Sequence, residues 1–107
     1  MPNEVKSQRL TVYVGNSHTW QGLNLSMAIV ECCRAQGMAG ATVTRGLLGF
    51  GRHSHIHRPH VLGLEEDLPE KVEIIDTPER IAEFLPLVEA MVGGALVVLE
   101  DVSVIRP

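Results

Sequence analysis

The chain has 107 residues, which suits one domain with its own hydrophobic core, and we treat residues 1–107 as that domain. Charged residues make up 21% of the chain, an ordinary globular proportion that excludes a disordered polyelectrolyte. The net charge of −4 argues against a nucleic-acid partner, because binding phosphates requires a basic surface.

The first half of the chain predicts a strand, a helix and a second strand. Residues 9–14 alternate between apolar and polar, which is the period of a half-buried strand, and residues 15–22 are predicted as a loop. From about Leu23, apolar residues recur at helical spacing, and Gly37 is placed to end the helix. The residues at that spacing are Leu25, Ala28, Ile29, Cys32 and either Ala35 or Gln36. A further strand is predicted from about Ala41 to Gly51.

The second half predicts a strand, a helix and a last strand. The strand runs from about residue 68 to 75, with Val72 and Ile74 on one face. Thr77 suits the N-cap of a helix and Pro78 its first position. This helix carries a stripe formed by Ile81, Phe84, Leu85, Val88 and Val92. A kink is expected at Pro86, and the final strand spans about residues 95–105.

The order of elements is therefore β-α-β-β-α-β, with two similar halves. This order predicts an α+β, ferredoxin-like fold, in which a four-stranded antiparallel sheet carries both helices on one face. Apolar residues fall on both faces of the last strand, at Leu96 and Val98 and at Val97 and Leu99. Both faces need burial, so we expect an oligomer of identical chains.

Two further features favour an intracellular protein. No stretch approaches the roughly 20 apolar residues of a membrane-spanning helix, and residues 1–4 show no signal-peptide pattern. Cys32 and Cys33 are neighbours on a predicted helix and point in different directions, so we expect one buried thiol and one half-buried thiol rather than a disulfide. These features predict a cytoplasmic location.

A long interval, about Arg52 to Asp67, separates the second and third strands, where a hairpin needs only about 2–5 residues. In an extended segment His53, His55 and His57 project to one side, and imidazoles bind zinc, copper or nickel. This pattern predicts a divalent-metal site. Two alternatives are a solvated histidine-rich loop and a pH-sensing loop that becomes charged near pH 6.5.

A glycine-rich stretch precedes that interval, reading Gly46-Leu47-Leu48-Gly49-Phe50-Gly51-Arg52. Glycine turns free backbone N–H groups, and with an adjacent arginine they form an anion-binding concavity. Arg45 falls in phase with Val43 and Leu47 on the predicted strand. We expect it either to pair with an acidic residue across a subunit boundary or to face a ligand.

These residues also carry a resemblance to a known family. The motifs are Gly40-Ala41-Thr42-Val43, Arg45-Gly46 and Gly49-Phe50-Gly51, together with Trp20-Gln21-Gly22, Leu68-Pro69 and Asp76. In this order they resemble the domain-of-unknown-function-190 family of PII-like signalling proteins, from about Arg9 to Ile105. The stretch Gly49-Phe50-Gly51-Arg52 is also similar to the base of the T-loop in PII proteins.

The resemblance implies a homotrimer with its three sheets facing inward and a mobile T-loop at about residues 52–67. It implies a nucleotide, adenine nucleotides included, bound in clefts between subunits and a T-loop that controls a membrane transporter, channel or enzyme. The sequence departs from PII proteins in having only Gly93-Gly94 before the last strand and no lysine after Lys71. We therefore expect a small or weakly charged anion, such as a nucleoside monophosphate. The expected ligand-binding residues are Arg45, Gly46, Gly49, Phe50, Gly51, Arg52, Gly93 and Gly94.

Other classes of function remain as alternatives. The histidines could serve a metal-binding protein similar to the trimeric CutA type, which is associated with copper. A small enzyme is the rival class, but nothing resembles a nucleophile elbow, and we identify no catalytic residues. The third alternative is a structural adaptor. A ligand binder would show ligand-dependent stability without turnover, which separates it from both.

Overall fold

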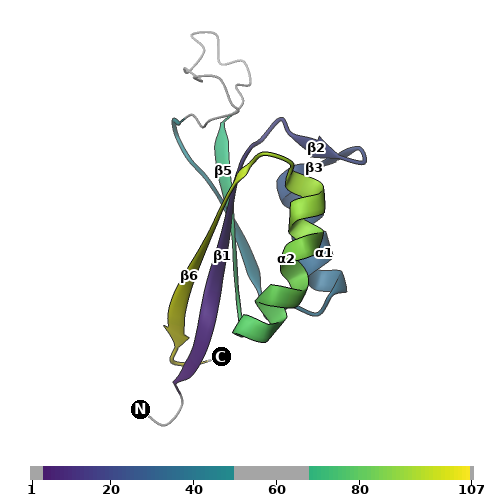
Figure 1. Ribbon diagram of the computed structural model, residues 1–107. Coiled ribbons are helices and arrows are strands. Elements are labelled where there is room, and N and C mark those ends of the chain that lie inside the picture. The colour runs from purple at the N-terminus through teal and green to yellow at the C-terminus, as the bar shows by residue number, and fades with distance from the viewer. Residues whose placement is uncertain (1–3, 50–67, 107) are drawn as a thin grey trace.

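The computed structural model describes residues 4–49 and 68–106. Its main sheet has four antiparallel strands in the order β4-β5-β1-β6, and both helices pack on one face of it (Figure 1). The strands are β1 (Val5–Gly15), β4 (Ala41–Arg45), β5 (Pro69–Asp76) and β6 (Leu96–Val104), and the helices are α1 (Leu25–Ala35) and α2 (Pro78–Val92). This arrangement confirms the predicted ferredoxin-like βαββαβ sandwich.

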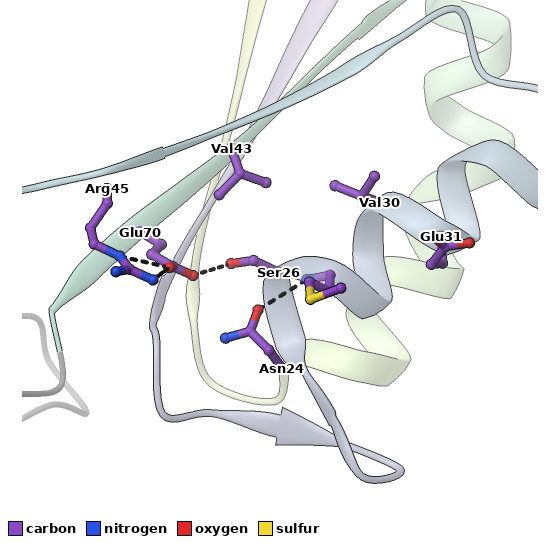
Figure 2. Close-up of a pocket in the computed structure, with 8 residues that line it drawn as sticks. Asn24, Ser26, Val30, Glu31, Val43, Arg45 and Glu70 are labelled. Carbon is purple, nitrogen blue, oxygen red and sulfur yellow. Dashed lines mark hydrogen bonds and ion pairs between the residues drawn. The ribbon is translucent and has the colours of Figure 1, made fainter. Parts of the chain in front are cut away.

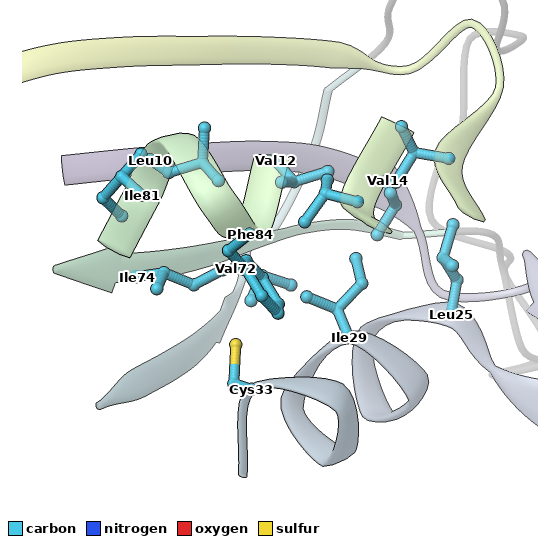
Figure 3. Packing of buried hydrophobic residues seen from close by; sticks show 12 residues of the cluster. Leu10, Val12, Val14, Leu25, Ile29, Cys33, Val72, Ile74, Ile81 and Phe84 are labelled. Carbon is cyan, nitrogen blue, oxygen red and sulfur yellow. The ribbon is translucent and has the colours of Figure 1, made fainter. Parts of the chain in front are cut away.

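The core lies between the sheet and the two helices. The central strand β1 pairs on both sides, so that Val12 stands opposite Val72 of β5 and Val97 of β6. Apolar side chains from β1, β5, α1 and α2 meet there (Figure 3). The cluster consists of Leu10, Val12, Val14, Leu25, Ile29, Cys33, Val72, Ile74, Ile81, Phe84, Val88 and Val92.

Helix α1 starts later than the sequence predicted, because a small hairpin comes first. The predicted loop contains β2 (Thr19–Trp20), which pairs with β3 (Leu23–Asn24), and β3 takes the first two residues of the predicted helix. Between them Gln21 and Gly22 both have positive φ, 49° and 84°, as a type I′ turn requires. The Asn24 side chain then accepts a hydrogen bond from the backbone N–H of Met27 at 3.0 Å and caps the helix.

The end of α1 is a Schellman motif, with Gly37 in the left-handed region at φ 71°. The N–H of Gly37 donates to the carbonyl of Arg34 (3.1 Å), and that of Met38 to the carbonyl of Cys33 (3.0 Å). Cys33 is buried and Cys32 half-buried, and both are free, as predicted. Leu25, Ala28 and Ile29 of the predicted stripe are buried. The prediction was wrong at the next position, because the core face of α1 passes through Cys33 rather than Cys32.

Helix α2 begins and ends where its capping residues predicted. The Thr77 side chain accepts from the N–H of Arg80 at 3.3 Å, Pro78 is the first helical residue, and Gly93 ends the helix at φ 59°. The helix continues past Pro86, and the predicted kink there stays a prediction. Within the described residues, neither α1 nor α2 is long and apolar enough to cross a membrane.

The predicted strand 41–51 was too long, because β4 ends at Arg45. The chain bends at Leu47 and Leu48, whose side chains are exposed, so Leu47 does not continue the row of Val43 and Arg45. At this point the ring of Pro69, on the neighbouring strand, lies 3.0 Å from where a Cβ of Gly46 would be. Residues 50 and 51 lie outside the described part of the chain.

The sheet face opposite the helices carries a mixture of apolar and charged side chains. Leu96 stands opposite Tyr13, and both are exposed in the single chain. Arg9 stands opposite Glu100 and pairs with it at 3.0 Å. The hydrogen bond from Arg9 lowers the pKa of the Glu100 carboxyl below its ordinary value. This face combines apolar residues with a cross-strand ion pair.

Replacing Gly37 with alanine should destabilise the protein by about 1 kcal/mol, because a Cβ is disfavoured at a left-handed φ. Gly40 provides the matched control, since its φ lies outside that region and an added Cβ meets no described atom within 4 Å. Gly40→Ala should be neutral or slightly stabilising. Urea unfolding of both variants measures the difference, and equal losses would contradict this account of the helix end.

The thiol of Cys33 should resist modification in the folded protein. Burial raises the pKa of the Cys33 thiol to about 11, so it stays protonated at pH 8. In single-cysteine variants labelled with a thiol reagent at pH 8, the protein retaining Cys32 should react first. The protein retaining Cys33 should react at a comparable rate only in denaturant. Rapid labelling of native Cys33 would contradict its placement in the core.

Candidate functional site

The structure describes five of the predicted ligand-binding residues, which are Arg45, Gly46, Gly49, Gly93 and Gly94. The predictions for Phe50, Gly51 and Arg52, and for a metal at His53, His55 and His57, lie outside the described residues. Within residues 4–49 and 68–106, no group of three or more His, Cys, Asp or Glu side chains could hold a metal ion.

Arg45 takes part in a hydrogen-bonded network centred on a buried carboxylate (Figure 2). Its Nε and Nη2 donate to Oε2 of Glu70 at 3.1 and 2.8 Å, and Oγ of Ser26 donates to Oε1 of Glu70 at 2.7 Å. The side chain of Glu70 is only 5% exposed, whereas that of Arg45 is 53% exposed. The sequence predicted either an acidic partner across a subunit boundary or a ligand. The partner is instead on the adjacent strand of the same chain.

The network follows from strand register and helix placement. Arg45 is the register partner of Glu70, and two residues along the same pair of strands Val43 stands opposite Val72. Side chains two apart share a face, so Glu70 lies on the helix-covered face with the core residues of β5. Ser26 is the second residue of α1, and its position in the first turn places its hydroxyl above β5. Three elements therefore meet at one carboxylate.

A groove of about 500 Å³ lies between α1 and the edge strand β4, a volume within the usual range of small-molecule sites. Figure 2 shows Arg45 and Glu31 toward opposite ends of it, with Val43 and Val30 between them. Its lining consists of Asn24, Ser26, Met27, Val30, Glu31, Val43, Arg45 and Glu70. Most of the surface of the groove is apolar, and its charged side chains lie toward the ends, with Arg45 and Glu70 at one end and Glu31 toward the other.

Most polar side chains of the groove are already hydrogen-bonded. Asn24 caps α1 through Oδ1, and its Nδ2 donates to the carbonyl of Asn16 at 2.7 Å. The hydroxyl of Ser26 donates to Glu70. Arg45 uses Nε and Nη2 on Glu70, which leaves the other guanidinium N–H groups of this half-exposed side chain as donors for a ligand.

The glycines after β4 have a packing role in the structure. A Cβ at Gly46 would lie 3.0 Å from Cγ of Pro69, and a Cβ at Gly49 would lie 3.2 Å from the same atom. The N–H of Gly46 donates to the carbonyl of Pro69 at 2.7 Å. That N–H is therefore engaged, and the predicted anion concavity has to use other donors.

The register aligns Arg45 with Glu70, and through β1 with the start of β6, so Gly93 and Gly94 lie toward the same end of the sheet as Arg45 but beside the opposite edge. They precede β6, whereas Arg45 ends β4, and the sheet order places those strands on opposite edges. Three strand spacings of about 4.8 Å separate the two edges, roughly 14 Å in all. One chain therefore does not bring the two halves of the predicted site together.

Sequence reasoning missed Glu70 and Ser26. Glu70 has the same strand phase as Val72 and Ile74, so alternation alone places a carboxylate in the buried row. Its partner became recognisable only with the β4–β5 register, which aligns it with Arg45. Ser26 carried no such signal, because the helical pattern placed it beside the apolar stripe.

Replacing Arg45 with alanine should destabilise the protein by about 2–3 kcal/mol, because the buried carboxylate of Glu70 loses its counter-charge. Arg34→Ala is the matched control, since the Arg34–Glu31 pair is exposed on α1. Its removal should cost less than about 0.5 kcal/mol. Chemical unfolding at pH 7 measures both losses, and a neutral Arg45→Ala would show that Glu70 does not need this partner.

Comparison with known proteins identifies the family. The family model DUF190, "Uncharacterized ACR, COG1993", matches residues 7–104. A UPF0166 protein of Aquifex aeolicus (strain VF5) is 34% identical over 101 residues, covering 94% of this chain and 95% of its own length. A UPF0166 protein of Methanocaldococcus jannaschii is 26% identical over 103 residues, covering 95% and 94%.

Solved structures show a similar fold at lower identity. CPII of Thiomonas intermedia K12, a nitrogen regulatory PII-like protein solved with ADP, AMP and bicarbonate, is 20% identical with a TM-score of 0.64. The match covers 97% of this chain and 92% of CPII. A candidate PII-like signalling protein of Thermus thermophilus is also 20% identical, with a TM-score of 0.64 and coverage of 96% and 93%. The chain belongs to the DUF190 family and has a PII-like, ferredoxin-like fold.

Proposed function

We propose that this protein is a PII-like signalling protein rather than an enzyme, and that it binds a small anionic or nucleotide-type ligand in clefts between the subunits of a homotrimer. Ligand binding is relayed to a protein partner, a membrane transporter, channel or enzyme, through a T-loop at residues 52–67. The observation that carries the proposal is that the candidate ligand-binding residues lie at two opposite edges of the sheet. Arg45 and Gly46 lie at one edge of the sheet, and Gly93 and Gly94 at the other edge of the same end.

Association of identical chains would bring the two groups of candidate residues together. When the β4 edge of one copy faces the β6 edge of the next, Arg45 approaches the glycines of the neighbouring copy. A closed ring repeats the same contact at every boundary, and three copies give three equivalent clefts. The apolar part of the open sheet face, including exposed Leu96, is buried in the same assembly when the sheets face inward.

The ligand class rests on two supports. Arg45 keeps guanidinium N–H groups free of Glu70, and such groups match the oxygens of phosphate or carboxylate. The structurally similar CPII is described as bound to ADP, AMP and bicarbonate, so this fold accommodates nucleotides and a small oxyanion. An adenine nucleotide of low charge fits both supports.

Thermal unfolding of the purified, metal-free protein should show a shift with AMP or ADP. A ligand at a hundred times its dissociation constant adds about 2.7 kcal/mol per site, which is readily measured. Zinc, copper and nickel form a separate arm of the same experiment. A shift with metals alone would move the function to His53, His55 and His57 and would contradict the nucleotide proposal.

Arg52→Ala provides the matched test of the site. The variant should weaken nucleotide binding while the native mass stays that of a trimer, because Arg52 is expected on the phosphate side of the ligand. Lys6→Ala removes the same charge from the start of β1, the far end of the sheet, and should leave the affinity unchanged. Equal affinities for wild type and Arg52→Ala would exclude Arg52 from the site.

A further inference from the structure

Two glutamates line the same groove as Arg45, and their environments differ. The side chain of Glu70 is 5% exposed and receives hydrogen bonds from Arg45 and Ser26. The side chain of Glu31 is 55% exposed and pairs with Arg34 on the surface of α1 at 2.9 Å. Water and salt screen an exposed charge much more than a buried one. Glu70 therefore influences the potential in the groove more than Glu31 does.

The carboxylate of Glu70 changes what Arg45 can offer a ligand. Both donors that Arg45 directs at it reach the same oxygen, Oε2, at 3.1 and 2.8 Å. The unit charges of the two side chains cancel at a distance, but the exposed half of the guanidinium still presents N–H groups. The pair thus supplies directional hydrogen bonds to an oxyanion with little net positive charge.

Ser26 keeps the carboxylate in place. Its hydroxyl occupies Oε1 at 2.7 Å, so Glu70 is held by α1 on one side and by Arg45 on the other. A carboxylate with both oxygens hydrogen-bonded inside the protein has little freedom to move away when a second anion approaches. Its repulsion is therefore a fixed property of the groove.

We infer that Glu70 is a specificity-determining residue that limits the negative charge of the ligand. The inference rests on the proposed function, in which Arg45 contacts the anionic part of a nucleotide. Each additional phosphate brings negative charge toward the carboxylate of Glu70 without meeting a net positive charge at the Arg45–Glu70 pair. Compared with Arg45 alone, the carboxylate of Glu70 makes two extra charges at about 10 Å less favourable, on the order of tenfold, at a dielectric between those of protein and water. Glu70 therefore shifts the preference of the site away from the triphosphate and toward the nucleoside monophosphate.

Isothermal titration of AMP and ATP into wild type and Glu70→Gln tests this inference at low salt. Glutamine keeps the size of the side chain and an oxygen that can accept from Arg45, and its NH2 group can donate to the hydroxyl oxygen of Ser26, so the main change is the loss of the charge. The ratio of the ATP to the AMP dissociation constant should fall about tenfold in this variant. Glu31→Gln is the matched comparison in the same groove, and it should change that ratio less than about twofold because its charge is already screened.

An unchanged ratio in folded Glu70→Gln would overturn the inference, as would an equal fall in Glu31→Gln. If Glu70→Gln does not fold, Arg45→Gln supplies the test, because it leaves the negative charge of Glu70 uncompensated. That variant should weaken ATP about tenfold more than AMP, and equal weakening of both would overturn the inference. Wild type that binds neither nucleotide would overturn the proposed function, and the inference with it. If wild type binds nucleotides but the ratio of the ATP to the AMP dissociation constant does not change in the variants, only the inference is overturned.

Discussion

The geometry of the candidate site depends on one buried carboxylate. Glu70 lies in the same row as Val72 and Ile74, where the fold otherwise places apolar side chains. A charge in that position is stable only when it is paired and hydrogen-bonded, and Arg45 and Ser26 meet that requirement from two different elements. Because the buried charge of Glu70 needs both partners, it holds α1 and β4 in place against β5.

The same carboxylate connects stability with function. Arg45 is at once the counter-charge of Glu70 and a cation of the proposed ligand site. A binding site whose cation also belongs to a structural ion pair has a well-positioned guanidinium, because Glu70 restricts the rotamers of the long Arg45 side chain. It loses attraction for highly charged ligands at the same time. The departures from PII proteins, a short Gly93-Gly94 turn and no lysine after Lys71, act in the same direction.

Much of the fold could be predicted because its signals are local. The N-cap at Thr77, the helix-ending Gly37 and the alternation through Val72 and Ile74 each depend on neighbouring residues, and the structure agrees with all three. The error in the length of β4 arose where a contact is distant in sequence. Strand β4 ends beside the ring of Pro69, which is far from Gly46 along the chain and reaches it only through strand pairing.

The candidate site was harder to predict for the same reason. The glycine motif predicted backbone donors for an anion. At Gly46, however, the ring of Pro69 leaves little room for a Cβ, and the N–H already donates to the carbonyl of Pro69. A glycine pattern does not distinguish packing from ligand approach, since both exclude a Cβ. Register does distinguish them, because pairing Arg45 with Glu70 shows where charge is available and where it is already balanced. In this chain, the residue opposite Arg45 on the next strand is therefore a better guide to the charge of the proposed ligand than the glycines are.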